Sequence, residues 1–225
     1  MLKPDRLITV LALGAVAALP RPARAQQLAD VCKAVTAATV GQWASFDATG
    51  NGSGTSKLRL AVVGSERAGD STLYWFEANF AGKDASHSGI VQVLTPSLST
   101  GTAGAHAVIV RAGGYPAMRV SGQTAGMLAD RVGYNKLAAE WAARCSMAQV
   151  VGWESVTVPA GTFRALHVKA DDGGEAWASP EIPFGLVKVR DKANELLLTG
   201  RGSDAKSSIT EKPLEMSLPG MLPKP

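Results

Sequence analysis

The sequence predicts a mainly β (α+β) fold, in which a curved antiparallel sheet or an incomplete β-barrel encloses helices. Short apolar segments separated by turn residues recur along the chain, which is typical of a β-meander or barrel. Helical periodicity is confined to two stretches, residues 26–38 and 123–147. Strands do not alternate with helices as they do in parallel α/β proteins, so we do not expect a parallel sheet.

The first 25 residues have the layout of a secretory signal peptide. Lys3 and Arg6 precede an apolar run over residues 7–19, and the segment ends in Ala23-Arg24-Ala25, an A-x-A cleavage pattern. The apolar run is too short for a membrane-spanning helix, which needs about 20 residues. We therefore expect cleavage after Ala25, a periplasmic location and no stable membrane span.

Composition and charge narrow the classes of function. Hydrophobic residues make up 46% of the chain and charged residues 19%, which excludes a disordered protein. The net charge is +4, but the signal segment holds four of the 23 basic residues and one of the 19 acidic residues, so the remainder carries +1. Nucleic-acid binding needs a clustered basic surface, and the sequence predicts none.

Each predicted helical stretch carries a cysteine on its apolar side. Cys32 lies in the first stretch and Cys145 near the end of the second, and these are the two cysteines of the chain. Because exported proteins fold in an oxidising compartment, we predict a disulfide between them. A pair of buried free thiols is the alternative.

Strands are expected between the two helical stretches and after the second. The first group covers residues 42–47, 58–62, 72–80, 90–94, 106–111 and 116–120, and the second covers 150–158, 162–170, 176–179, 185–190 and 195–199. Pro159-Ala160-Gly161 predicts a hairpin turn between the first two strands of the second group. Residues 26–211 are thus one half-barrel domain, followed by a Pro-rich extended tail over 212–225.

The aromatic strand 72–80 is apolar on both of its faces. Tyr74, Phe76 and Phe80 alternate with Trp75 and Glu77, whereas a sheet with one solvated face would alternate apolar with polar residues. Both faces should therefore be covered in places. We predict an aromatic-lined cavity between the concave face and the helices of residues 125–145, and the pattern does not say which face is concave.

Candidate ligand-binding residues are mostly large apolar or aromatic side chains on these elements. They are Tyr74, Trp75, Phe76, Glu77, Met127, Trp141, Trp153 and Trp177. Glu77 is the single acid among them, and an acid inside an apolar cavity could orient a ligand. An exposed or ion-paired glutamate is the alternative interpretation.

Motifs for catalysis, metal binding or cofactor binding are absent from the sequence. His87, His106 and His167 are not spaced as metal ligands, and there is no Gly-x-Ser-x-Gly elbow. Residues 203–206 match Ser-x-x-Lys but lack the accompanying elements of that catalytic pattern. We therefore expect no enzyme, no metal and no cofactor.

Several stretches resemble a group of uncharacterised exported bacterial proteins. Residues 152–163 read GWESVTVPAGTF, residues 177–188 read WASPEIPFGLVK, and residues 74–77 and 111–118 are also similar to that group. The order of helix, strands, helices and strands is similar in architecture to the periplasmic lipoprotein carriers LolA and LolB. That likeness implies an incomplete barrel closed by helices, with an apolar cavity for acyl chains.

Three hypotheses of function follow. The first is a non-catalytic periplasmic carrier of an apolar small molecule, such as a lipid or a lipoprotein acyl chain. The second is a cell-envelope protein-interaction module with a filled core. The third is a hydrolase whose site residues are dispersed along the sequence. A carrier needs an apolar cavity open to solvent, whereas a hydrolase needs Ser, His and Asp within hydrogen-bond reach.

Overall fold

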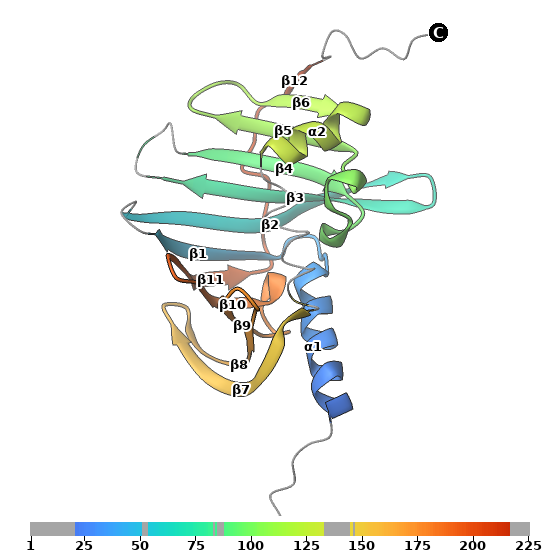
Figure 1. The fold of residues 1–225 in the computed structure, drawn as a ribbon. Helices are drawn as coiled ribbons and strands as arrows, with labels where there is room; N and C mark the ends of the chain where they lie inside the picture. The colour runs from blue at the N-terminus through green and yellow to red at the C-terminus, as the bar shows by residue number, and fades with distance from the viewer. Residues whose placement is uncertain are drawn as a thin grey trace, which may run out of the picture.

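The computed structural model describes residues 21–50, 54–82, 84, 88–132, 145 and 147–216. Over these residues the chain forms a single twelve-stranded sheet with two α-helices against it (Figure 1). The sheet is open, because its outermost strands, β12 and β7, do not pair with each other. The predicted mainly β class with a curved sheet is confirmed, and the described strands do not close into a barrel.

The elements follow the chain in the order that the sequence predicts. The helices are α1 (Arg21–Thr36), η2 (Leu98–Gly104), α2 (Gln123–Arg131) and η3 (Pro183–Gly185), where η denotes a 3-10 helix. The first six strands are β1 (Trp43–Gly50), β2 (Gly54–Ala68), β3 (Ser71–Ala81), β4 (Gly89–Thr95), β5 (Ala107–Ala112) and β6 (Met118–Ser121). The others are β7 (Gln149–Val158), β8 (Gly161–Lys169), β9 (Glu175–Ala178), β10 (Leu186–Arg190), β11 (Asn194–Gly202) and β12 (Leu214–Glu215). Because α1 begins at Arg21, it extends across the predicted cleavage position, and cleavage stays a prediction.

Two antiparallel meanders make up the sheet. Strands β1–β6 pair in sequence order, strands β7–β11 do the same, and β11 joins the meanders by pairing with β1. In Figure 1 the second meander is strongly curved at β7 and β8. The predicted hairpin is confirmed by the pairing of Val158 with Gly161. Its tip folds back onto β11, where the N–H of Ala160 donates to the carbonyl of Leu198 at 3.1 Å.

Both α-helices cover the same face of the sheet, which we call the helix face. Ala125 and Ala129 of α2 are buried against Val93 and Val108 of β4 and β5. Val31 of α1 is buried against apolar side chains of β8 and β9. Strand pairing carries this face continuously from β6 to β7, so the helices pack on opposite ends of one surface.

A strained aromatic residue of η3 fills the core beside the helix face. Phe184 has a φ of 62°, a left-handed conformation that costs about 1–2 kcal/mol for a residue with a Cβ. Its side chain is buried in one cluster with Phe46, Phe76 and Leu198. Full burial of a large apolar side chain contributes about 1.5–3 kcal/mol, which offsets that strain.

The predicted disulfide is confirmed. Cys32 of α1 and Cys145, shortly before β7, are bonded with their Cα atoms 5.7 Å apart. The bond ties α1 to the chain that enters the second meander. Among the described residues, no helix combines the length and apolar character needed to cross a bilayer.

The C-terminal segment crosses the other face of the sheet, which we call the tail face. Residues 203–216 run behind the strands in Figure 1 and end at β12. The N–H of Ala205 donates to the carbonyl of Gly41 at 2.8 Å, and Ile209 is buried against an apolar cluster that includes Trp75. The expected extended tail begins at residue 212, and within it β12 pairs in parallel with β6.

Candidate functional site

Strand β3 divides the predicted ligand-binding residues between the two faces. Phe76 pairs with Val62 and Val93, which lie on the helix face. Tyr74 is on the same side and meets Phe76 edge to face, with ring centroids 6.4 Å apart. Because successive side chains of a strand point to opposite faces, Trp75 and Glu77 lie on the tail face.

Glu77 anchors the tail segment to the sheet. Its side chain is almost fully buried, and its carboxylate accepts hydrogen bonds from the Ser208 N–H (2.9 Å), the Ser208 hydroxyl (2.6 Å) and Gln92 Nε2 (2.7 Å). Arg59 Nη1 lies 3.8 Å from the same carboxylate. The structure therefore contains the ion-paired arrangement, and the partners of Glu77 come from the chain itself.

The other predicted aromatic residues lie in three different apolar clusters. Trp75 is buried beside the tail and Trp153 packs in the cluster that contains α1. Trp177 belongs to the same apolar cluster as Phe76, although strand register places it on the tail face of the second meander. Met127 lies on α2 and is 45% exposed, and Trp141 lies outside the described residues. Tyr74, Phe76 and Trp177 thus share one apolar cluster, and the other described members of the predicted set lie elsewhere.

An ion-pair network surrounds Trp177 on the tail face. The His167 ring stacks on Trp177 with centroids 4.4 Å apart. Hydrogen bonds from Arg190 and Lys169 lower the pKa of Glu175 to about 2. Because the cations here have carboxylate partners of the same sheet, the network stabilises the fold and offers no open charge to a ligand.

One small cavity lies between the helix face and the described elements that cover it. A cavity of about 50 Å³ is lined by apolar side chains that include Phe76, Val93, Leu98 and Phe184. A water molecule in the liquid occupies about 30 Å³, so this cavity has room for one or two of them. Most of the helical stretch 125–145 lies outside the described residues, so the predicted aromatic-lined cavity beneath it stays a prediction.

A larger groove opens at the margin of the helix face. It encloses about 690 Å³ between the turns β1–β2 and β10–β11 and the residues after β3. Ala48, Val189 and Leu196 are among its lining residues, and strand register places all three on the helix face. Its volume lies in the range of about 300–1,000 Å³ that is common for ligand sites, and the apolar residues share its walls with polar residues and glycines. The groove is therefore the candidate functional site.

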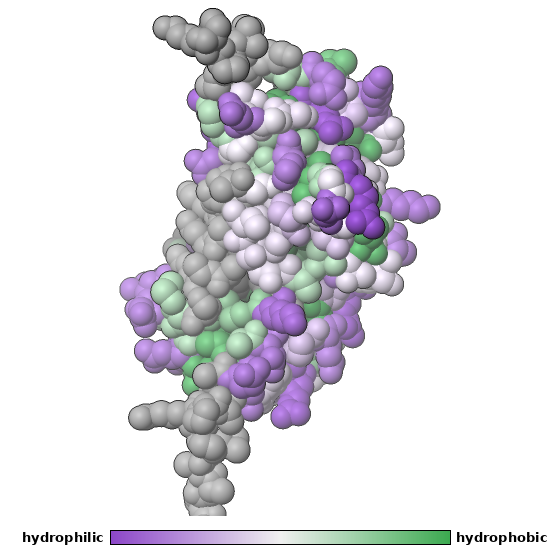
Figure 2. All heavy atoms as spheres, turned by 90° about the vertical axis from the view of Figure 1, so that its right-hand side faces the viewer, coloured by the Kyte–Doolittle hydropathy of each residue, from purple (hydrophilic) through white to green (hydrophobic). Residues whose placement is uncertain are grey.

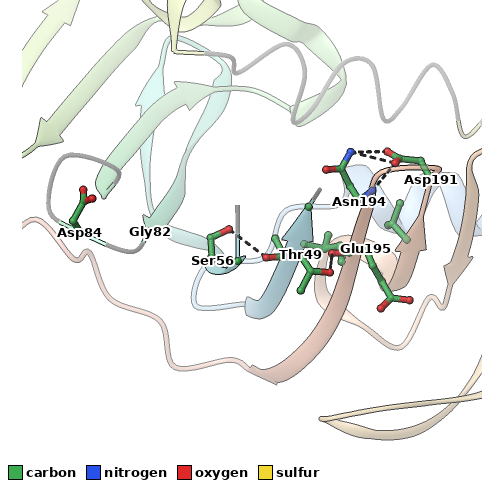
Figure 3. A pocket seen from close by; sticks show the side chains of 12 residues that line it. Thr49, Ser56, Gly82, Asp84, Asp191, Asn194 and Glu195 are labelled. Carbon is green, nitrogen blue, oxygen red and sulfur yellow. Dashed lines mark hydrogen bonds between the residues drawn. The ribbon is translucent and has the colours of Figure 1, made fainter. Parts of the chain in front are cut away.

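Polar groups at the groove rim mainly shape the turns around it (Figure 3). Asp191 accepts hydrogen bonds from the backbone N–H groups of Ala193 and Asn194, both at 2.7 Å, and so closes the β10–β11 turn. Figure 3 shows Asp191 and Asn194 joined in this way. Ser56 and Thr49 donate to backbone carbonyls of neighbouring strands. Neither hydroxyl bonds a histidine or a carboxylate, which is the partner that an activated nucleophile needs.

Sequence reasoning missed the groove residues for a physical reason. Val189 and Leu196 belong to the consecutive strands β10 and β11, whereas Ala48 is distant in sequence and meets them only through the β1–β11 pairing. One available signal is the small side chain of Ala48, which leaves room above the sheet. Among the described residues, no three His, Cys, Asp or Glu side chains are grouped as a metal site would require.

Comparisons with known proteins give distant structural likenesses. No protein-family model and no curated protein matches the sequence. A predicted lipoprotein from Parabacteroides distasonis aligns with a TM-score of 0.36 at 13% identity, over 73% of this chain and 96% of that one. A predicted exported protein with a YmcC-like fold from Bacteroides fragilis gives 0.35 at 11%, over the same shares.

MucB, solved in complex with MucA(peri), gives a TM-score of 0.47 at 13% identity, over 84% of this chain and 59% of MucB. These identities and TM-scores do not establish a family or a function. The function of this chain therefore has to be argued from its own residues.

Proposed function

We propose that the protein is an exported, non-catalytic binding protein that carries an apolar or amphipathic molecule, such as an acyl chain, in the helix-face groove. The observation that carries the proposal is the groove itself, about 690 Å³ with apolar residues from three strands in its wall. An acyl chain gains about 0.8 kcal/mol for each CH2 group that such a surface removes from water. The enclosed cavity of about 50 Å³ is too small for that ligand.

The export part of the proposal rests on two features. The N-terminal layout is that of a cleaved signal peptide, and a disulfide joins Cys32 to Cys145. Disulfides persist in oxidising compartments such as the bacterial periplasm. Figure 2 agrees with a protein in water, because hydrophilic residues are spread over the side shown and hydrophobic residues form separate patches.

The test is titration of the mature protein with a fluorescent fatty acid. We expect saturable binding at micromolar concentrations and displacement by unlabelled fatty acid. Leu196→Lys places a charge in the groove wall and should weaken binding at least tenfold. The matched control is Leu214→Lys, because Leu214 is 57% exposed on β12 and lies outside the groove.

Two results would count against the carrier function. One is an absence of binding at tens of micromolar fatty acid. The other is equal binding by Leu196→Lys and Leu214→Lys. Native mass spectrometry of protein isolated from its own periplasm adds an independent measurement, with a co-purifying lipid as the expected result.

A second candidate function is a cell-envelope protein-interaction module. It is favoured by the exposed apolar side chains of Met118, Leu214 and Met216, which lie together on the paired strands β6 and β12 and the residue that follows. Exposed apolar residues that gather in one place commonly mark interaction sites. Photo-crosslinking to an envelope protein from position 214, with none from position 196, would favour this function over the carrier.

A further inference from the structure

A second groove lies on the tail face, at the same end of the sheet as the candidate site but on the opposite side. It encloses about 670 Å³ between the ends of β3–β4, the β5–β6 turn and the tail segment. Asn79, Ile90 and Arg111 line it from paired positions on adjacent strands, and Glu211 reaches it from the tail. Its walls thus come from three parts of the chain.

Tyr115 is held out into solvent at the edge of this groove. Its side chain is 72% exposed, the most among the large apolar side chains of the described residues. The turn that presents it is well defined, because Gly113 and Gly114 take left-handed φ values of 56° and 82° and the Tyr115 N–H donates to the carbonyl of Ala112 at 3.0 Å. A tyrosine ring on such a turn offers a large contact surface at low cost in conformational entropy.

A charge pair faces the groove and is neutral as a unit. Arg111 Nη1 lies 3.2 and 3.5 Å from the two carboxylate oxygens of Glu211, and both side chains are about one-third exposed. A guanidinium carries five N–H donors. Since Nη1 bonds Glu211, the N–H groups on the other two nitrogens remain available to a ligand. Since the charges compensate each other, the site does not favour a phosphate, a carboxylate or a cation.

We infer that this groove binds a neutral carbohydrate chain, with Tyr115 as the stacking surface and the Arg111–Glu211 pair as hydrogen-bonding partner. A sugar ring has an apolar C–H face for the tyrosine ring and a rim of hydroxyls that both donate and accept. Gly114 in the wall has no heavy atom within 4 Å of the position a Cβ would take, so a ligand can approach the backbone there. A protein partner is less suited, because its anchor side chains need desolvated apolar pockets. In this groove the apolar residues Phe80, Ile90 and Pro116 are interspersed with polar ones, which are Asn79, Ser88, Arg111 and Glu211.

The experiment titrates the mature protein with cellotetraose and with chitotetraose. We expect saturable binding, with shifts in the backbone NMR signals of Gly89, Gly113 and Gly114. Tyr115→Ala should weaken binding about tenfold and leave the melting temperature unchanged, because the ring is exposed. Tyr115→Phe keeps the ring and should bind within about threefold of the parent protein.

Matched controls separate this groove from the candidate site on the helix face. Met118→Ala alters an exposed residue of the same hairpin outside the groove and should leave sugar binding unchanged. Leu196→Lys should also leave it unchanged, so failure of the fatty-acid test and failure of this test are distinguishable. The inference is overturned if neither tetrasaccharide shifts these signals at millimolar concentration, or if Tyr115→Ala binds as well as Met118→Ala.

Discussion

Consecutive residues of β3 show how differently the two faces of the sheet are held. Phe76, on the helix face, is buried in an apolar cluster with Phe46 and Phe184, where contacts are numerous and non-directional. Glu77, on the tail face, is buried among hydrogen bonds from Gln92 and Ser208. The helix face thus depends on apolar area and leaves a groove at its margin, whereas the tail face combines an apolar cluster around Trp75 and Ile209 with buried hydrogen bonds to Glu77.

The largest expected effect is on the attachment of α1 to the helix face. Replacing both Cys32 and Cys145 by Ser should lower the free energy of unfolding by about 4–5 kcal/mol, because the bond closes a loop with a sequence separation of 113 residues. Urea denaturation of the two proteins measures this change. A loss below about 1 kcal/mol would mean that packing alone holds α1 in place.

Removing Glu77 tests the polar anchoring of the tail face. Glu77→Ala should cost about 3 kcal/mol, because breaking a buried charged pair leaves its donors without an acceptor. Hydrogen exchange should become faster at the Ser208 amide, because its N–H donates a hydrogen bond to the Glu77 carboxylate in the parent protein. The matched control is Glu215→Ala, since Glu215 pairs with Arg119 at the surface of the same tail, and exposed pairs contribute about 0–1 kcal/mol. Equal losses in both variants would contradict the anchoring role.

Close packing against Trp43 provides a third test on the tail segment. A Cβ at Gly202 would lie 2.5 Å from Trp43 Nε1, and that indole is held by its hydrogen bond to Asp204 at 2.8 Å. Gly202→Ala should therefore cost about 1–3 kcal/mol through overpacking. At Gly200 the nearest atom of Trp43 would be 3.4 Å away, so Gly200→Ala is the control with the smaller loss. Thermal unfolding of both variants measures the difference.

The smallest expected effect is a pH dependence at the ion-pair network around Trp177. The pKa of Glu175 is lowered to about 2 by hydrogen bonds from Arg190 and Lys169. A lowered carboxyl pKa stabilises the folded state above the unfolded value near 4.5, and this contribution is lost as pH falls from about 4.5 to 2. Urea midpoints should fall over this range, and Arg190→Gln should make the fall shallower. An unchanged pH profile in that variant would show that Glu175 does not cause the loss of stability at low pH.

Local patterns in the sequence predicted most of the elements. The aromatic strand expected over residues 72–80 is β3 (Ser71–Ala81), and the turn at Pro159-Ala160-Gly161 joins β7 to β8. These predictions succeed because alternation and turn chemistry act between residues that are close in sequence. The disulfide was predictable because the chain has two cysteines, which allow one pairing, and because the sequence predicts an oxidising compartment.

The candidate site could not be predicted to the same extent. Strand 72–80 is apolar on both sides, so its pattern did not distinguish the face under α2 from the face under the tail. The groove arises where β11 pairs with β1, which brings Leu196 opposite Ala48. That pairing joins residues far apart in the chain, and no local periodicity encodes it. The predicted binding residues were accordingly chosen by residue type, and those that the structure describes are spread over both faces of the sheet.

The sequence by itself determined the β-rich class, the element order and the paired cysteines, and it predicts an export signal. The tertiary structure decided which side of β3 faces the helices, that Glu77 bonds the tail, and where the two grooves lie. The physical reason is the range of the interactions involved. Hydrophobic periodicity and turn preferences act within a few residues, whereas strand partners, buried polar contacts and grooves depend on how distant segments share the same limited apolar surface.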